Sequence, residues 1–497
     1  MKKNFIHLGK YFTYLLFLTL ILNSCSKDDD EQPVPITEEK PVQKSNAKDL
    51  LSISFSKANN TSFTEDAYVQ KSLNNLYYIT LPNNVTSRTL TIEIVSSNKS
   101  SVKVNNVAAT TIAGKYNNTD ASISKLSVST EDVLTIEVFA ESGSKNTFEV
   151  LAQPGIKEFD KLIYAFKDKY DIPGVSYALA NNSKNEIVYK SGVGYGIKET
   201  KTRVKPSHLF RLASMSKQHT AICAVKLIEE GKFKLDDLVF GPTGLLKDKY
   251  ASVSAKAAKI TVRHLLEHTT GYSASPDYMF DSPYSGFSMD QRIEAMLKST
   301  APNDPGTTFA YYNTGYGILG YLIEKFSGKT FETYMKELYA KVGVTDIHVG
   351  GTQSQRRSNE VAYYAQNGYN AQGADMNVRA SAGGIIASTE QLFKLLWTID
   401  GKSNIPDLMS SDSRKMMFTP SKVGTGRYAL GWRANHSFFP GGFYHGGNLS
   451  GVATFWVYGE EYSVAFLCNS RSYLSGFDDE FYVMARDIIA EAKKRGM

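Results

Sequence analysis

The sequence predicts a multidomain protein with two folded regions, a small β-sandwich followed by an α/β domain. Between about Leu51 and Ala152 the chain is rich in Ser, Thr, Asn and Val and runs in short alternating stretches, which is typical of a small sandwich. From Pro154 onward, helical and strand patterns interleave. The 497 residues, of which 42% are hydrophobic, are enough for two or three domains with ordinary cores.

Residues 1–24 have the pattern of a bacterial secretion signal. Lys2 and Lys3 precede an apolar stretch over residues 11–22 that is too short to span a bilayer comfortably. This stretch ends in the letters LNSC at residues 22–25, which resemble the lipobox of bacterial lipoproteins. The resemblance implies cleavage before Cys25 and lipidation of that residue; the alternative is a plain secretory peptide with an incidental cysteine.

Residues 25–46 are expected to form a flexible tether, because they contain three prolines, many charges and no periodicity. Residues 26–31 (SKDDDE) are similar to the acidic export signal of some Gram-negative surface lipoproteins. We therefore expect a protein held by a lipid on Cys25 to the outer membrane of a Gram-negative bacterium, either in the periplasm or on the cell surface.

Residues 47–153 are expected to form the β-rich module. The expected strands are short and separated by Asn, Ser and Gly clusters; they cover residues 51–55, 76–81, 90–95, 102–107 and 133–139. The segment contains no His and no Cys, and no group of residues in it suggests catalysis. We interpret it as a spacer, with a binding module as the alternative.

Residues 154–497 are expected to form the α/β domain. Apolar residues spaced along 156–170 form a helical stripe, and two strands are expected at 175–180 and 186–194. Further helices are expected over residues 215–230, 262–268, 290–298, 316–326, 389–398 and 479–494, and late strands over residues 428–432, 452–458 and 463–469. This order predicts one sheet assembled from both ends of the segment.

Charge and cysteine content exclude some classes of protein. The net charge of +6 falls to +3 when the three lysines of the predicted signal are subtracted, and no basic cluster is present, so we expect no nucleic-acid partner. Three cysteines cannot build a disulfide framework. Cys223 and Cys468 are expected to be buried packing residues, although a disulfide between them stays open.

The first candidate for chemistry is the segment from Ser214 to Lys217. A Ser and a Lys three residues apart on a helix share one face, so the Lys amine can reach the Ser hydroxyl and activate it. Seven of the eight Ser-x-x-Lys matches lie in the signal, the tether or the β-rich segment, and only Ser214 opens a strongly helical run. The alternative is that Ser214 merely caps the helix.

Two further short motifs follow along the chain. Tyr311 and Asn313 combine a phenol, which can relay a proton, with an amide, which can fix a substrate carbonyl. His445 and Gly447 combine a hydrogen-bond or proton donor with a backbone that a ligand can approach closely. Neither motif is specific by itself.

Taken in order, the three motifs resemble the serine β-lactamase and penicillin-binding-protein superfamily, and most closely its class C-like branch. Supporting stretches are FRLASMSK (210–217), LLEHTTGY (265–272), PGTTFAYYNTGY (305–316) and SAGGIIAS (381–388). The resemblance covers residues 156–495. It implies an α/β fold with an antiparallel sheet, flanking helices and a helical lobe, with the active site between them.

The resemblance also implies roles for individual residues and requires no cofactor or metal. Ser214 would be the acylated nucleophile and Lys217 its proton acceptor, with Tyr311 as general base and acid. His445 would share the proton transfer to the leaving group, and Asn313 would bind the substrate amide or carbonyl. The oxyanion hole would consist of two backbone amides, those of Ser214 and Asn448, beside Gly447.

The third motif departs from true β-lactamases, which usually carry Lys-Thr-Gly. No Lys-Thr-Gly occurs in this chain, and His445 in place of that Lys is similar to esterase, D-aminopeptidase and related peptidase members. We therefore expect a serine hydrolase of the esterase or D-amino-acid peptidase/carboxypeptidase type, which forms an acyl-enzyme from a small-molecule or peptide ester or amide. The alternatives are β-lactamase or penicillin-binding activity, and an inactive lipoprotein that binds a peptide or glycan.

Residues 264–268 (HLLEH) fit a metal motif, His-x-x-Glu-His, in which both His would lie on one helical face. The motif lies within the stretch that resembles the superfamily, where His268 would cap and pack the helix end. We expect no metal at His264 and His268.

Overall fold

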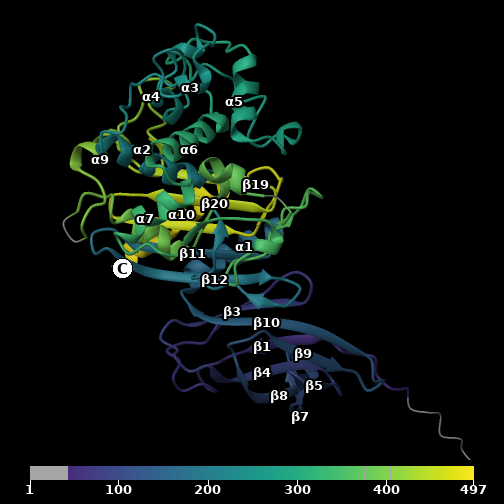
Figure 1. Cartoon of the computed structure of the whole chain (residues 1–497). Coiled ribbons are helices and arrows are strands. Elements are labelled where there is room, and N and C mark those ends of the chain that lie inside the picture. The colour runs from purple at the N-terminus through teal and green to yellow at the C-terminus, as the bar shows by residue number, and fades with distance from the viewer. Residues whose placement is uncertain (1–42, 374, 403–404) are drawn as a thin grey trace, which may run out of the picture. The chain divides into compact units, whose positions relative to one another are not determined.

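The computed structural model of the chain describes residues 43–373, 375–402 and 405–497 (Figure 1). The predicted signal, the predicted lipidation site Cys25 and most of the expected tether lie outside these residues. Residues 45–497 group into one compact unit. No helix within the described residues is long and apolar enough to cross a membrane.

The region from Leu50 to Gly155 consists of two packed sheets. The four-stranded sheet has the order β1 (Leu50–Ser54), β4 (Thr89–Ser97), β8 (Thr119–Ser129), β7 (Thr110–Tyr116). The six-stranded sheet has the order β2 (Tyr68–Lys71), β3 (Leu76–Pro82), β10 (Lys145–Gly155), β9 (Leu134–Phe139), β5 (Ser101–Val104), β6 (Val107–Ala108). Ile92 of the first sheet and Ile136 and Val150 of the second share one buried core, since alternate residues of each strand face it. The predicted sandwich is confirmed.

A seven-stranded antiparallel sheet forms the centre of the second region. Its order is β13 (Thr202–Arg203), β12 (Glu186–Ile197), β11 (Gly174–Asn181), β21 (Tyr462–Cys468), β20 (Val452–Tyr458), β19 (Phe443–Leu449), β18 (Arg433–Ala434). Early strand β11 pairs with late strand β21, so the sheet is assembled from both ends of the segment, as predicted.

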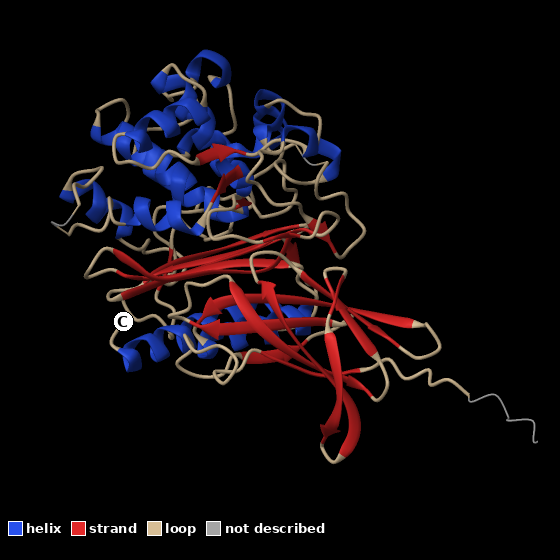
Figure 2. Cartoon of the chain, turned by 90° about the horizontal axis from the view of Figure 1, so that it is seen from below, coloured by secondary structure: helices blue, strands red, loops and turns tan. Residues whose placement is uncertain are grey.

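Helices cover both faces of this sheet (Figure 2). Helices α1 (Lys157–Tyr170) and α10 (Phe477–Arg495) pack on one face, where Phe166 and Phe481 meet large strand residues such as Phe466. Smaller residues on the other face, including Ala178 and Ala465, allow the helical lobe to approach closely. The strands are therefore buried on both faces, and their large and small residues alternate.

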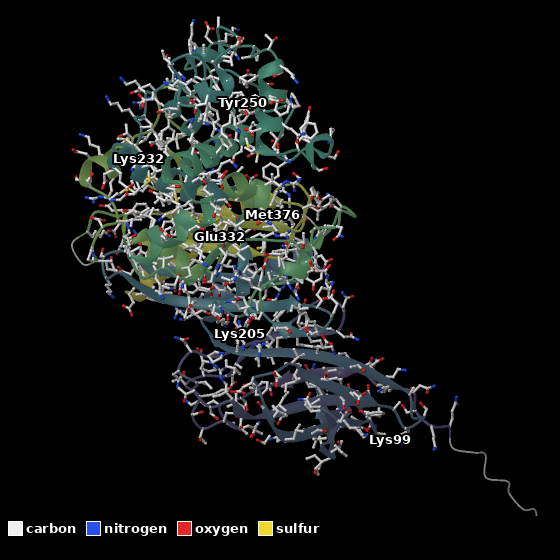
Figure 3. All side chains as sticks on the ribbon, in the orientation of Figure 1. Lys99, Lys205, Lys232, Tyr250, Glu332 and Met376 are labelled. Carbon is white, nitrogen blue, oxygen red and sulfur yellow. The ribbon has the colours of Figure 1, made fainter. Side chains whose placement is uncertain are left out.

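The helical lobe is built from helices of the middle of the chain. They are α2 (Ser216–Glu229), α3 (Lys247–Tyr250), α4 (Val262–Leu266), α5 (Met289–Lys298), α6 (Asn313–Ser327), α7 (Phe331–Ala340), α8 (Thr389–Leu396) and α9 (Ser411–Phe418). Tyr250, labelled in Figure 3, donates a hydrogen bond to Asp290 at 2.8 Å within this lobe. Small sheets formed by β14 (Phe210–Arg211), β17 (Ile385–Ala387) and β15 (Ile347–Val349), and by β16 (Tyr364–Ala365) and β22 (Ser470–Arg471), complete the domain.

The strand expected over residues 428–432 is wrong. Gly431 has a φ of +82°, and the Ala429 amide donates to the Trp432 carbonyl, so the backbone turns here instead of extending. Strand pairing with β19 begins only at Arg433. The turn places Tyr428 and Arg433 beside the candidate site described below.

The β-rich module and the α/β domain share a buried contact. Tyr78 of β3 packs in the same core as α1 and the large sheet. Thr80 of β3 donates a hydrogen bond of 2.8 Å to Asp160 of α1, which also accepts from the hydroxyls of Tyr177 and Tyr189. Burial raises the pKa of Asp160 to about 6, and these hydrogen bonds oppose the rise.

Cys223 and Cys468 are both buried and free. Burial raises the pKa of each thiol, and the open question of a disulfide between them is answered in the negative.

Candidate active site

Ser214 lies in a tight 3₁₀ turn, Ala213–Met215, directly before α2. Its side chain is partly exposed, whereas Ala213 and Met215 are buried. The N-cap of α2 is Met215, and no side chain caps the helix, so Ser214 does not serve as a helix cap. Ala213 has a φ of +48°, an unfavourable conformation for a residue with a Cβ, and such strain is concentrated at functional sites.

Lys217 lies one turn further along and points back to Ser214. Its Nζ is 3.3 Å from the Ser214 Oγ and donates a 2.6 Å hydrogen bond to the Ala382 carbonyl. Burial lowers the pKa of Lys217 to about 7; Asp277 opposes this shift, and Arg433 adds to it. A neutral amine is therefore well populated near neutral pH and can accept the Ser214 proton.

The Ala382 carbonyl is presented by a π turn over Ala380–Gly384. This turn is fixed to α2 by two hydrogen bonds, from Thr220 to the Ser381 carbonyl at 2.7 Å and from the Ile385 amide to Ser216 Oγ at 3.1 Å. The stretch SAGGIIAS therefore positions the Ala382 carbonyl, which accepts the hydrogen bond that orients Lys217.

Tyr311 lies immediately before α6, with its ring against the Lys217 amine. The Lys217 Nζ is 4.9 Å from the ring centroid. Burial raises the pKa of the Tyr311 phenol, while the Ser214 hydroxyl and Arg433 oppose the rise. Tyr311 is therefore protonated near neutral pH and suited to donate a proton rather than to accept one.

His445 is buried and belongs to a chain of three hydrogen-bonded side chains. The Tyr312 amide donates to His268 Nδ1 at 2.9 Å, so His268 carries its proton on Nε2 and donates it to the Tyr428 oxygen at 3.1 Å. Tyr428 then donates to His445 Nε2, also at 3.1 Å, and His445 Nδ1 donates to the Gly446 carbonyl at 2.6 Å. Only this arrangement of protons satisfies every pair.

This arrangement of protons affects whether His445 can transfer a proton to the leaving group, the role expected from the sequence. Burial, Arg433 and Lys217 all lower the pKa of His445 far below its ordinary range, so the ring is neutral. Both ring nitrogens are engaged by protein groups, which leaves no free N–H for a leaving group. The geometry favours a role in positioning: His445 packs beside Tyr311, with ring centroids 6.1 Å apart.

Gly447 allows β19 to lie directly against the Ser214 turn. A Cβ on Gly447 would be 2.3 Å from the Leu212 carbonyl oxygen and 3.0 Å from the Ala213 Cβ. Thr454 of neighbouring β20 secures the contact by donating to the Leu212 carbonyl at 2.8 Å. The backbones of Ser214 and Asn448, predicted to form the oxyanion hole, are thereby brought to the same place.

Asn313 begins α6, and one N–H of its side-chain amide is already bound to another residue. The Nδ2 donates to Asp277 at 2.6 Å, and the Oδ1 is buried without a hydrogen-bond partner. The Nδ2 group carries a second N–H, which remains available for the substrate amide or carbonyl that Asn313 is expected from the sequence to bind.

Three residues near the site had no sequence pattern to reveal them: Asp277, Tyr428 and Arg433. Arg433 is half-buried, with its guanidinium carbon 5.6 Å from the centroid of the Tyr311 ring. Within the described part of the chain it has no carboxylate partner. Tyr428 is one of 30 tyrosines, Asp277 lies in a segment without periodicity, and Arg433 follows a segment expected from the sequence to be an ordinary strand, so nothing in the sequence distinguished them.

His264 and His268 do not share a helical face. Helix α4 ends at Leu266, and His268 lies beyond it with a φ of +59°. His264 Nδ1 accepts from the Thr261 amide at 3.2 Å as part of a capping box, while His268 uses both nitrogens in the hydrogen-bonded chain. Among the described residues, no cluster of His, Cys, Asp or Glu is arranged to hold a metal.

An antiparallel sheet, a helical lobe and a Ser-Lys-Tyr cluster between them define a hydrolase fold of the penicillin-recognising type. The family profile described as Beta-lactamase matches residues 159–486. The chain therefore belongs to the Beta-lactamase family.

The relatives and solved structures agree with this assignment. The chain is 24% identical over 330 residues to Protein flp of Staphylococcus aureus (strain N315), covering 64% of this chain and 63% of that protein, less than two thirds of its length. It is 26% identical over 323 residues to Penicillin-binding protein 4* of Bacillus subtilis (strain 168). The match covers 61% of this chain and 68% of that protein. The structure of D-alanine carboxypeptidase AmpC from Burkholderia cenocepacia superposes with a TM-score of 0.54 at 18% identity. The superposition covers 67% of this chain and 98% of that chain, which shows the shared fold.

Proposed function

We propose that the protein is a serine hydrolase of the carboxypeptidase type, which forms an acyl-enzyme on Ser214 and releases a leaving group that carries a carboxylate. The observation that carries the proposal is Arg433, a guanidinium beside Tyr311 that has no carboxylate partner among the described residues. A buried or half-buried cation is stabilised when an anion binds to it. The Arg side chain can bind a carboxylate by donating two parallel N–H hydrogen bonds.

The residues around Ser214 account for each proton in the reaction. The neutral Lys217 amine takes the Ser214 proton as Oγ bonds to the substrate carbonyl carbon. The carbonyl oxygen becomes an oxyanion facing the amides of Ser214 and Asn448, an interaction that typically contributes about 10²- to 10³-fold in rate. The carbon–nitrogen bond then breaks, and the leaving amine takes the Tyr311 proton, which Lys217 replaces. Water attacks the acyl-enzyme by the same steps in reverse.

Arg433 favours a carboxypeptidase over a simple esterase. It lies on the β19 side of Tyr311, where the leaving group would emerge, and its charge lowers the pKa of Lys217 and His445. A leaving group with a terminal carboxylate would neutralise this charge, while an uncharged alcohol would not. One structurally similar protein is itself described as a D-alanine carboxypeptidase, which supports D-amino-acid substrates here.

A pair of substrates that differ only in the terminal carboxylate tests the proposal. D-alanyl-D-alanine and D-alanyl-D-alanine amide have the same scissile bond, and we expect kcat/KM to favour the carboxylate by about 100-fold. In Arg433→Gln this preference should fall to about threefold or less. Arg427→Gln, the same charge change nearby in the chain, should keep it. Equal turnover of both substrates by the natural protein would refute the proposal.

We also propose that Cys25 carries the lipid expected from the sequence and anchors the hydrolase to the outer membrane. The proposal rests on residues 1–25 alone.

A further inference from the structure

Asp277 brings a negative charge to the edge of the candidate site. It lies between α4 and α5, and its side chain is half-buried. One carboxylate oxygen accepts from Asn313 Nδ2 at 2.6 Å and the other from the Met279 amide at 3.0 Å. The carboxylate is therefore held in place by Asn313, a residue of the candidate site.

Two arginines hold the loop around Asp277 by hydrogen bonds to its backbone, and neither forms an ion pair with the carboxylate. Arg292 is fully buried and donates to the carbonyls of Tyr278 and Met279. Arg379 Nε donates to the Met279 carbonyl at 3.1 Å. Both guanidinium groups thus bind backbone oxygens, and no Lys or Arg of the described chain lies within ion-pair distance of Asp277.

The bond to Asp277 also fixes the orientation of the Asn313 side-chain amide. A carboxylate can only accept, so the Asn313 amide must turn its NH₂ group toward Asp277 and its oxygen away. Because the Asn313 oxygen is buried, this side of the site offers the second amide N–H of Asn313 and the negative charge of Asp277. A substrate ammonium placed there would meet a carboxylate that no Lys or Arg of the described residues neutralises.

Asp277 and Arg433 act on the same catalytic groups with opposite sign. Asp277 raises the pKa of Lys217 and of Tyr311, and Arg433 lowers both. The two unpaired charges are thus both close to the reacting atoms, one at Asn313 and the other at the β19 side of Tyr311.

We infer that Asp277 is a specificity-determining residue that selects acyl groups bearing a free, protonated amine. The inference rests on the proposed function, which places the leaving group at Arg433; we place the acyl group at Asn313. If Asp277 and Arg433 both bind the substrate, the substrate is a short peptide with two charged ends. Its ammonium binds Asp277 and its carboxylate binds Arg433. N-acylated peptides lack the first of these charges and are poor substrates.

Two nitroanilides test the inference without involving Arg433, because their leaving group has no carboxylate. D-alanine 4-nitroanilide has a free amine and N-acetyl-D-alanine 4-nitroanilide does not. We expect the full-length protein to favour the free amine by at least about 30-fold in kcat/KM. In Asp277→Asn the preference should fall to about threefold or less. Asp304→Asn, which removes an exposed carboxylate of the same lobe, should keep it.

The outcomes separate the inference from the proposed function. Equal turnover of both nitroanilides by the natural protein would overturn the role of Asp277 while leaving the serine hydrolase intact. An Asp277→Asn variant that loses the same factor on both substrates would show that Asp277 only supports the structure, which also overturns the inference. Turnover of neither nitroanilide, with no acyl adduct on Ser214, would overturn the hydrolase and the inference together.

Discussion

The Nζ of Lys217 lies 3.3 Å from the Oγ of Ser214, within hydrogen-bond reach across one helical turn. The Ala382 carbonyl holds the same amine at 2.6 Å, and the Tyr311 ring lies against it. A buried lysine without a carboxylate within hydrogen-bond distance loses its proton more easily than an exposed one, which is the property that a base for Ser214 requires.

The pH dependence of activity should follow Lys217. Its pKa is lowered to about 7 by burial, so the neutral base is populated as the pH rises through this value. We expect kcat/KM on D-alanyl-D-alanine to rise with pH through about 7 and to level off above it. A pH–rate profile measures this directly. A profile that stays flat between about pH 5 and pH 9 would mean that Lys217 is not the base.

Gly447→Ala should damage catalysis far more than stability. The new Cβ would be 2.3 Å from the Leu212 carbonyl oxygen, so β19 must move away from the Ser214 turn. We expect kcat to fall by about 10²-fold or more, because the oxyanion amides separate. Gly446→Ala is the matched control, since its Cβ would meet only the Thr454 carbonyl oxygen at 3.6 Å. Equal effects of both changes on kcat would contradict this account.

The buried Asp160 should make stability depend on pH. Its folded pKa is raised from 3.8 to about 6, so the folded state binds the proton more tightly than the unfolded state does. This contribution to stability is fully present below about pH 4 and is lost as the pH rises through about 6, by about 2 to 3 kcal/mol. We expect the free energy of unfolding of the natural protein, relative to Asp160→Asn, to fall over this range in denaturant titrations. A constant difference between the two would contradict the prediction.

Cys25→Ala should release the protein from the membrane or block its processing. Cys25 supplies the only thiol of the predicted lipobox, so its loss removes the lipid attachment point. Fractionation of cells that produce each form measures the result. Ser26→Ala is the control and should leave the protein with the membranes; an unchanged membrane fraction for Cys25→Ala would argue against the anchor.

The sequence predicted those features of the site that are encoded locally. The spacing of Ser214 and Lys217 follows from one helical turn, and the close approach of β19 follows from the lack of a side chain at Gly447. The hydrophobic periodicity likewise located β20 and both terminal helices of the α/β domain to within a few residues.

Tertiary contacts between distant segments could not be predicted in this way. Asp277 and Asn313 are 36 residues apart, and only the folded lobe brings them together. Tyr428 and Arg433 lie in a segment that alternates like a strand, but Gly431 turns the backbone there and directs both residues to the site. The hydrogen bond between Tyr428 and His445 could not be predicted for the same reason, because Tyr428 comes from that turn.

Location of the acyl adduct tests the central claim most directly. The protein is incubated with a fluorophosphonate, digested, and its labelled peptide sequenced by mass spectrometry. We expect the adduct on Ser214 and not on Ser216, whose hydroxyl accepts from the Ile385 amide at 3.1 Å, and we expect no adduct in Ser214→Ala although that variant folds. An adduct on any other serine, or labelling that persists in Ser214→Ala, would contradict the account.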